Sequence, residues 1–161
     1  MAGLAAWRFE GPAGAARAAE VLSGLVEAGR LDLRDAATAV WDPGQGRPRT
    51  QQLLADAPGS LDGGFWGLLF GVVFFVPLLG AAVGAPTGAT AGALADVGID
   101  DGFINRLRDQ VTPGTSALLA LGSGSDLERL HDGLAARLRS EHISTDLTAD
   151  QAGALRAVFG G

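Results

Sequence analysis

Residues 63–95 read GGFWGLLFGVVFFVPLLGAAVGAPTGATAGALA, a run of 33 residues that contains no charged side chain. Its glycines form two series with a spacing of four, namely Gly63, Gly67 and Gly71, then Gly80, Gly84, Gly88 and Gly92. Residues four apart share one face of an α-helix, so each series predicts a groove along which another helix can approach closely. Pro77 lies between the series and cannot continue a helical hydrogen-bond ladder. The run is therefore predicted to be a helical hairpin with a glycine-zipper packing surface.

The length of the two arms limits where this hairpin can insert. Arms of roughly 13 and 18 residues extend about 20 and 27 Å as helix. A bilayer core is about 30 Å thick, so a full double crossing is marginal. The residues nearest the run are acidic (Asp56 and Asp62 before it, Asp96 after it), whereas loops held on the cytoplasmic side are usually basic. Three arrangements remain open: a re-entrant hairpin, a hairpin across a thinned bilayer, and hairpins packed together in a soluble oligomer.

Charge and composition exclude several classes of function. The chain of 161 residues has a net charge of −6, and its 12 basic residues are all arginine. Both flanks of the apolar run are acidic, which argues against a nucleic-acid partner. The absence of lysine and cysteine excludes lysine Schiff bases, thiolate catalysis and disulfides. The first eight residues do not resemble a signal peptide, so we expect the flanking parts to be cytoplasmic.

Apolar periodicity and turn residues predict nine elements outside the run. The expected strands span residues 4–10, 35–41, 47–54, 116–121 and 140–145, and the expected helices span 15–28, 100–110, 125–138 and 148–159. The first strand, with Trp7 and Phe9 on either side of Arg8, is predicted to be half-buried. Capping boxes are predicted at Ser125 and Thr148.

This order of elements predicts an α+β fold, a ferredoxin-like sandwich in which one antiparallel sheet carries helices on one face. Neither flank has enough strands to be stable alone. Residues 1–62 and 96–161 are therefore expected to form one discontinuous domain, interrupted by the apolar hairpin of residues 63–95. Because one sheet would then hold both flanks, the hairpin must begin and end on the same side of any bilayer.

Few side chains suggest chemistry, and we predict no catalytic, cofactor or metal site. His131 follows Glu128 at a spacing that can serve a metal, but no second such pair completes a site. His142 has no histidine partner within reach by spacing, so both histidines are interpreted as structural or surface residues. The loop at residues 122–125 is interpreted as a turn and helix cap rather than a phosphate cradle. The acidic group Asp96, Asp100 and Asp101 is interpreted as helix capping, with cation binding as the alternative.

Several stretches of the chain resemble a bacterial family of uncharacterised membrane proteins of unknown function. The similar residues are 64–71 (GFWGLLFG), 77–85 (PLLGAAVGA), 96–104 (DVGIDDGFI) and 112–118 (TPGTSAL). The resemblance implies a ferredoxin-like domain with a glycine-zipper hairpin, and it implies no activity, substrate or catalytic residue.

We therefore expect a non-enzymatic structural protein that self-assembles into a homo-oligomer through the glycine-zipper hairpin and associates with membranes. Its expected partners are other copies of itself and the lipid bilayer, without nucleic acid. Two alternatives belong to other classes: a pore-forming or membrane-perturbing protein, and a small-ligand sensor that uses the sheet face.

Overall fold

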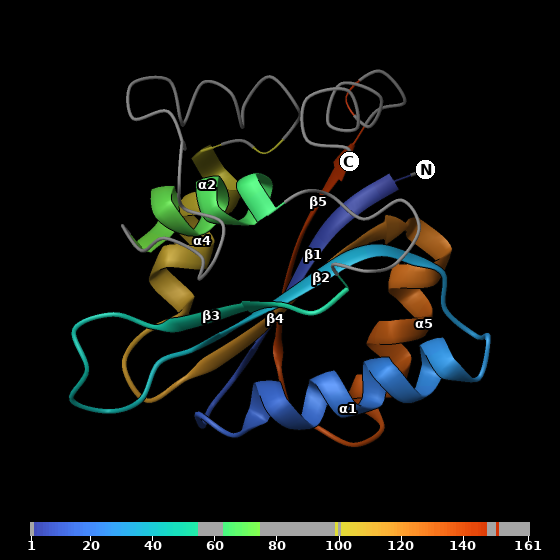
Figure 1. The fold of residues 1–161 in the computed structure, drawn as a ribbon, viewed down its shortest axis with the longest axis horizontal. Coiled ribbons are helices and arrows are strands. Elements are labelled where there is room, and N and C mark those ends of the chain that lie inside the picture. The colour runs from blue at the N-terminus through green and yellow to red at the C-terminus, as the bar shows by residue number, and fades with distance from the viewer. Residues whose placement is uncertain (1, 55–62, 75–98, 100, 148–150, 152–161) are drawn as a thin grey trace.

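The computed structural model describes residues 2–54, 63–74, 99, 101–147 and 151 (Figure 1). The strands are β1 (Ala2–Phe9), β2 (Leu33–Val40), β3 (Arg49–Gln52), β4 (Ser116–Ser123) and β5 (Glu141–Leu147). The helices are α1 (Gly14–Glu27), α2 (Gly63–Phe74), α4 (Asp101–Gln110) and α5 (Gly124–Ala135). All five predicted strands and the first three predicted helices are confirmed, while the last predicted helix lies outside the described residues except at residue 151.

The five strands form one sheet in the order β3-β2-β4-β1-β5, and every pair of neighbours is antiparallel. Strand β1 lies inside the sheet between β4 and β5. Helix α1 connects β1 to β2, and helix α5 connects β4 to β5, which gives the two β-α-β units of a ferredoxin-like arrangement. Strand β3 returns from β2 as an added edge. The predicted α+β class with an antiparallel sheet is therefore confirmed.

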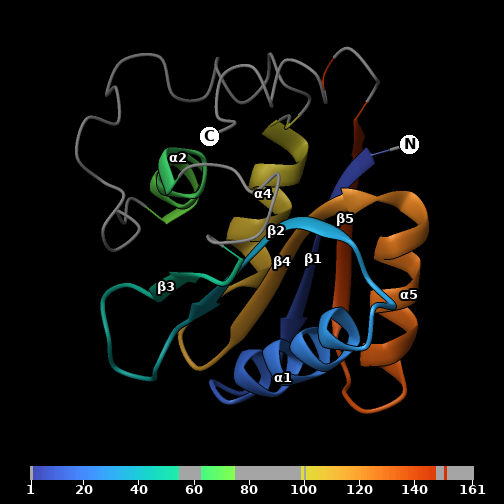
Figure 2. The same ribbon diagram turned by 45° about the vertical axis from the view of Figure 1, so that its right-hand side comes forward.

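Helices cover both faces of the sheet, and the prediction of helices on one face was wrong (Figures 1 and 2). Helices α1 and α5 pack on one face, and α2 and α4 pack on the other. The reason lies in the strands, which carry apolar residues on both sides. In β4, Leu118 and Ala120 face α1 and α5, whereas Leu119 and Leu121 face α2 and α4. A strand covered on both faces is apolar almost throughout.

Strand β1 is likewise buried on both faces rather than half-buried as predicted. Its exception is Arg8, whose side chain is 19% exposed and reaches the end of α4. The Arg8 Nε donates a hydrogen bond of 2.8 Å to the carbonyl oxygen of Gln110, the last residue of α4. The guanidinium also forms an ion pair of 3.1 Å with Glu10. A cation at a helix C-terminus stabilises the exposed carbonyl groups there.

The two helices on the α1 face begin at hydroxyl side chains. Ser116 Oγ, which is buried, accepts a hydrogen bond from the backbone N–H of Ala15 and donates one to the carbonyl of Gly11. Helix α5 is capped by Ser123, whose Oγ accepts from the N–H of Asp126 at 3.2 Å. The prediction of Ser125 as the cap was therefore wrong by two residues. Ser123 ends β4, so strand and helix meet without a loop.

Candidate functional site

Helix α2 contains the first predicted glycine series, and the structure places it in the core of the domain. Its residues from Phe65 to Phe70 are all buried, including Gly67, while Gly71 is half-buried. A helix that is apolar on every side is stable only when it is covered on every side. Here the apolar side chains of α2 share one core cluster with residues of α4, β1, β2 and β4. The first arm of the run is thus part of the folded domain.

Aromatic side chains run along α2 at intervals of four residues. Trp66 stacks on Phe70 with 6.0 Å between ring centroids, and Phe70 stacks on Phe74 at 6.1 Å. Phe74 then meets the ring of Trp41, at the end of β2, edge to face at 5.8 Å. Trp66 is fully buried, and within the described part of the chain its Nε1 has no hydrogen-bond partner. The ring therefore packs within the core of the domain.

Arg108 of α4 caps the C-terminus of α2. Its Nη2 donates to the carbonyl oxygen of Val72 at 2.8 Å, and its Nε donates to that of Val73 at 3.1 Å. These carbonyl groups belong to the last turn of the described helix α2. The forked guanidinium satisfies both, so α2 ends at a charged side chain of its own domain.

Replacing Arg108 with alanine should destabilise the domain by roughly 1 kcal/mol, because two helix-terminal carbonyl groups lose a charged donor. Urea unfolding followed by circular dichroism measures this change. Arg108→Lys keeps the positive charge, but an ammonium group cannot donate to both carbonyl oxygens in the geometry of a guanidinium. This variant should therefore be more stable than Arg108→Ala and less stable than the parent. Arg137→Ala, at an exposed position after α5, serves as the control and should change little. Equal stability of Arg108→Ala and the parent would contradict the capping role.

The second glycine series, Gly80, Gly84, Gly88 and Gly92, lies outside the described residues, so the predicted hairpin and its zipper stay predictions. The structure does place the two points between which that segment runs. The last described residue before that segment is Phe74, at the end of α2, and the next one is Ile99, just before α4. Ile99 belongs to the core cluster between α2, α4 and the sheet, and Phe74 packs against the same cluster. Both points therefore lie on one face of the sheet.

Among the described residues, no helix has the length and apolar character needed to cross a membrane. Helix α2, the most apolar, has 12 residues.

The structure brings together three aromatic side chains that the sequence pattern keeps apart. The Trp7 ring of β1 is fully buried, and its Nε1 donates a hydrogen bond of 3.0 Å to Nδ1 of His131 on α5. The His142 ring of β5 stacks on Trp7 with 5.3 Å between centroids, and the two imidazoles lie 4.8 Å apart. We call these three residues the His–Trp–His cluster. Sequence spacing gave no partner for His142, and the register of β1 with β5 supplies one.

The cluster favours neutral imidazoles. Because His131 Nδ1 accepts the hydrogen bond from Trp7, the ring carries its single proton on Nε2. Burial, and then the charge of His131, lower the pKa of His142 below the ordinary histidine value. His131 Nδ1 is also closed to a metal ion while the bond to Trp7 is present. The described residues contain no group of three or more side chains that could hold a metal ion.

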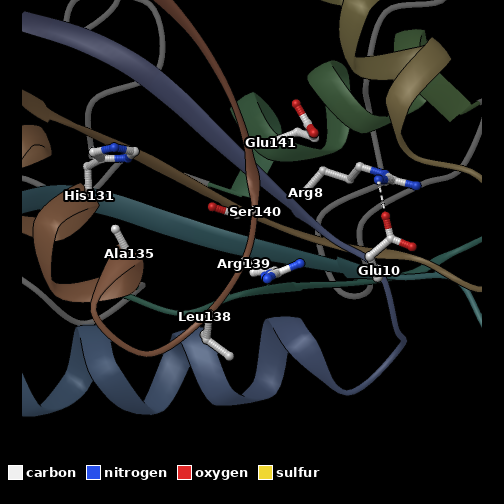
Figure 3. Close-up of a pocket in the computed structure, with 8 residues that line it drawn as sticks. All are labelled: Arg8, Glu10, His131, Ala135, Leu138, Arg139, Ser140 and Glu141. Carbon is white, nitrogen blue, oxygen red and sulfur yellow. Dashed lines mark hydrogen bonds and ion pairs between the residues drawn. The ribbon is translucent and has the colours of Figure 1, made fainter.

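A cavity of about 500 Å³ opens beside His131 at the edge of the sheet (Figure 3). Charged side chains of both signs line it: Arg8, Glu10, Arg139 and Glu141, together with Ser140 and the apolar Ala135 and Leu138. Figure 3 shows the Arg8–Glu10 ion pair at one end and His131 at the other. The lining is therefore nearly balanced in charge and does not select an anion or a cation.

The other predicted groups have structural roles or lie outside the described residues. Ser123 Oγ donates to Asp126 Oδ2 at 2.8 Å and caps α5, so residues 122–125 form a strand end and helix cap, and the predicted turn between them is absent. Asp101 is the first residue of α4, where a carboxylate stabilises the N-terminus, whereas Asp96 and Asp100 are not described.

Comparison with known proteins leads to one family. No curated protein and no solved structure matches the chain. One family model, described as "Protein of unknown function (DUF1269)", matches residues 60–160. That range includes α2, α4, β4, α5 and β5, and with them the apolar run and both histidines. Since the match covers more than half of the chain, the protein belongs to the DUF1269 family.

Proposed function

We propose that the protein is a non-enzymatic structural protein that assembles into a homo-oligomer through the second half of its apolar run, residues 75–95. In this proposal the ferredoxin-like domain is the carrier, and the series Gly80, Gly84, Gly88 and Gly92 is the contact surface. The alanines beside that series broaden the surface on which a helix of another copy could pack.

The observation that carries the proposal is the placement of α2. The first glycine series lies on a helix that its own chain buries, and Arg108 satisfies the carbonyl groups at the end of that helix. The first arm therefore requires no partner outside the chain. The second series lies in a stretch that holds no charged residue before Asp96, so its apolar side chains favour burial away from water.

The positions of Phe74 and Ile99 favour assembly over a membrane crossing. Residues 75–98 number 24, and as two equal helical arms they would each extend about 18 Å. Two crossings of a bilayer need about 20 residues each. A single crossing would put Phe74 and Ile99 on opposite sides of the membrane, whereas both belong to one face of one sheet. A shallow re-entrant insertion into lipid is the other environment that this length permits.

The double substitution Gly84→Leu with Gly88→Leu should reduce the assembly to monomers, because two leucines fill the predicted groove. Light scattering after size exclusion, without detergent, measures the mass, and circular dichroism checks that the domain stays folded. The matched control is Thr87→Leu with Thr90→Leu, which adds bulk to the same segment outside the glycine series. The control should keep the parent mass.

An unchanged mass in the glycine double variant would contradict assembly through this surface, as would a monomeric parent. Flotation of the parent with liposomes separates the two environments. Protein that stays at the bottom of the gradient and is oligomeric supports assembly in water, and protein that floats supports re-entrant insertion.

A further inference from the structure

The chain has two histidines among 161 residues, and the fold places them side by side on one tryptophan. His131 comes from α5 and His142 from β5, and Trp7 comes from β1 at the opposite end of the sequence. We propose that the His–Trp–His cluster is a pH-sensitive clasp that holds the edge strand β5 against α5 when both imidazoles are neutral and releases it when they are protonated.

The hydrogen bond from Trp7 to His131 can form only while His131 Nδ1 carries no proton. The buried indole N–H has His131 Nδ1 as its acceptor at 3.0 Å. An imidazolium carries a proton on both nitrogens, so a protonated His131 turns an N–H toward the N–H of Trp7. The indole donor then loses its partner inside the protein, and an unpaired buried donor is costly.

His142 responds to the same change through its ring. It lies on Trp7 at 5.3 Å and 4.8 Å from His131, so two positive charges would stand within contact distance of each other. His142 keeps part of its surface exposed, and its partial burial, followed by the charge of His131, lowers its pKa below the ordinary value. The unfolded chain therefore binds more protons below the ordinary histidine pKa. Stability is complete above that pKa and is lost as the pH falls through it.

Burial and His131, and no carboxylate, are the causes of the lowered pKa of His142. On α5, Glu128 and Asp132 are exposed, and the cavity beside His131 holds two carboxylates and two guanidinium groups. Strand β4 contributes no titratable side chain beneath α5, and Arg17 and Glu20 of α1 line a separate hollow with Leu138. The charges of α4 lie across the sheet, on its opposite face. His131 and His142 are thus the titratable side chains that contact the Trp7 ring.

Release acts on β5 because that strand is at the edge of the sheet. Among the described strands β5 pairs with β1 alone, through the register that sets His142 opposite Trp7. Opening the clasp would free the α5 side of this strand and expose the Trp7 ring. The proposal does not depend on assembly through residues 75–95, and each can fail without the other.

Nuclear magnetic resonance of the indole N–H groups tests the clasp in the full chain. The three tryptophans give three separate signals, and Trp7→Phe assigns that of Trp7. Between pH 7.5 and 5 the Trp7 signal should shift and lose its protection from hydrogen exchange. The signals of Trp41 and Trp66, which lie in other parts of the fold, should stay unchanged. A Trp7 signal that moves no more than theirs would overturn the proposal.

Thermal unfolding of a double variant gives a second, independent test. His131→Gln keeps an acceptor for Trp7, and His142→Phe keeps a ring on it, but neither side chain titrates. On going from pH 7.5 to pH 5, the Tm of the parent should fall about 3 °C further than that of the double variant. Equal losses of Tm would refute the clasp. Should the double variant not fold, the same Tm comparison is made with the single variant His142→Phe, and the indole signals of the parent give the second readout. An equal loss of Tm, or an unchanged Trp7 signal, would then refute the clasp.

Discussion

Leu69→Asp is expected to unfold the entire domain. Leu69 lies in the middle of α2, is fully buried, and belongs to the core cluster between α2, α4 and the sheet. A carboxylate at this position would have to be buried without a cation or to stay protonated, at a cost of several kcal/mol. Domains of this size are stable by about 5–15 kcal/mol, so most of that stability would be lost.

Far-ultraviolet circular dichroism and the yield of soluble protein measure the effect of Leu69→Asp. The control is Asn105→Asp on the exposed side of α4, where the new carboxylate can still accept the hydrogen bond from Arg108. That variant should keep the parent Tm. If α2 were instead a detachable arm, Leu69→Asp would leave the sheet and the other helices folded. A near-parent Tm would therefore contradict the placement of α2 in the core.

Gly14→Ala is expected to lower stability by about 1–3 kcal/mol, although it replaces glycine with a better helix former. A Cβ added at Gly14, the first residue of α1, would lie 2.3 Å from the Cβ of Phe9. Phe9 is buried at the end of β1 and is fixed in the core beneath α1 and α5, so it has little room to move. Helix α1 would have to shift away from the sheet and weaken the hydrogen bond from Ala15 to Ser116.

Gly24→Ala in the same helix provides the matched control for Gly14→Ala. A Cβ at Gly24 meets nothing within 4 Å, so the substitution should stabilise the protein by about 0.4–1 kcal/mol through the unfolded chain. The free energy of unfolding in urea should therefore change in opposite directions for the two variants. If both stabilised the protein, the close approach of α1 to Phe9 would be refuted.

Local patterns predicted most of the secondary structure. Helices such as α1 and α4 have one buried apolar stripe, and strands such as β3 are bounded by turn residues, so periodicity alone identifies them. The cap of α5 was misplaced because Ser123 and Ser125 are equally suitable by type. The choice of Ser123 depends on where β4 ends, which is a property of the sheet rather than of the local sequence.

The second helical layer could not be predicted from periodicity. Helix α2 is apolar on every side, and such a helix has the same composition whether lipid, another copy or its own domain covers it. The apolar residues on both sides of β4 were a usable signal, because a strand with no polar face requires cover on both faces. Together with the apolar run, this two-sided strand indicated that an apolar helix of the same chain, here α2, covers the second face.

The His–Trp–His cluster lay beyond prediction for a different reason. His131 and His142 are separated by the end of α5 and the start of β5, and Trp7 is 124 residues from His131. Their contact depends on the β1–β5 register and on the orientation of α5, both of which are long-range properties. The adjacency of β1 and β5 is implied by a ferredoxin-like order, but the register that sets Trp7 opposite His142 is not.

The place of β1 between β4 and β5 limits the order in which the sheet can form during synthesis. Strands β4 and β5 do not pair with each other, and both pair with β1. Arg8 of β1 lies opposite Glu141 of β5, so this pairing can form only after residue 141 has been synthesised. Such distant pairings make folding slow, and they leave the apolar strand β1 without its partners for most of synthesis. The matched range, residues 60–160, lacks β1 and β2 altogether. The matched range contains β4 and β5, and both of these strands pair with β1, which lies outside it.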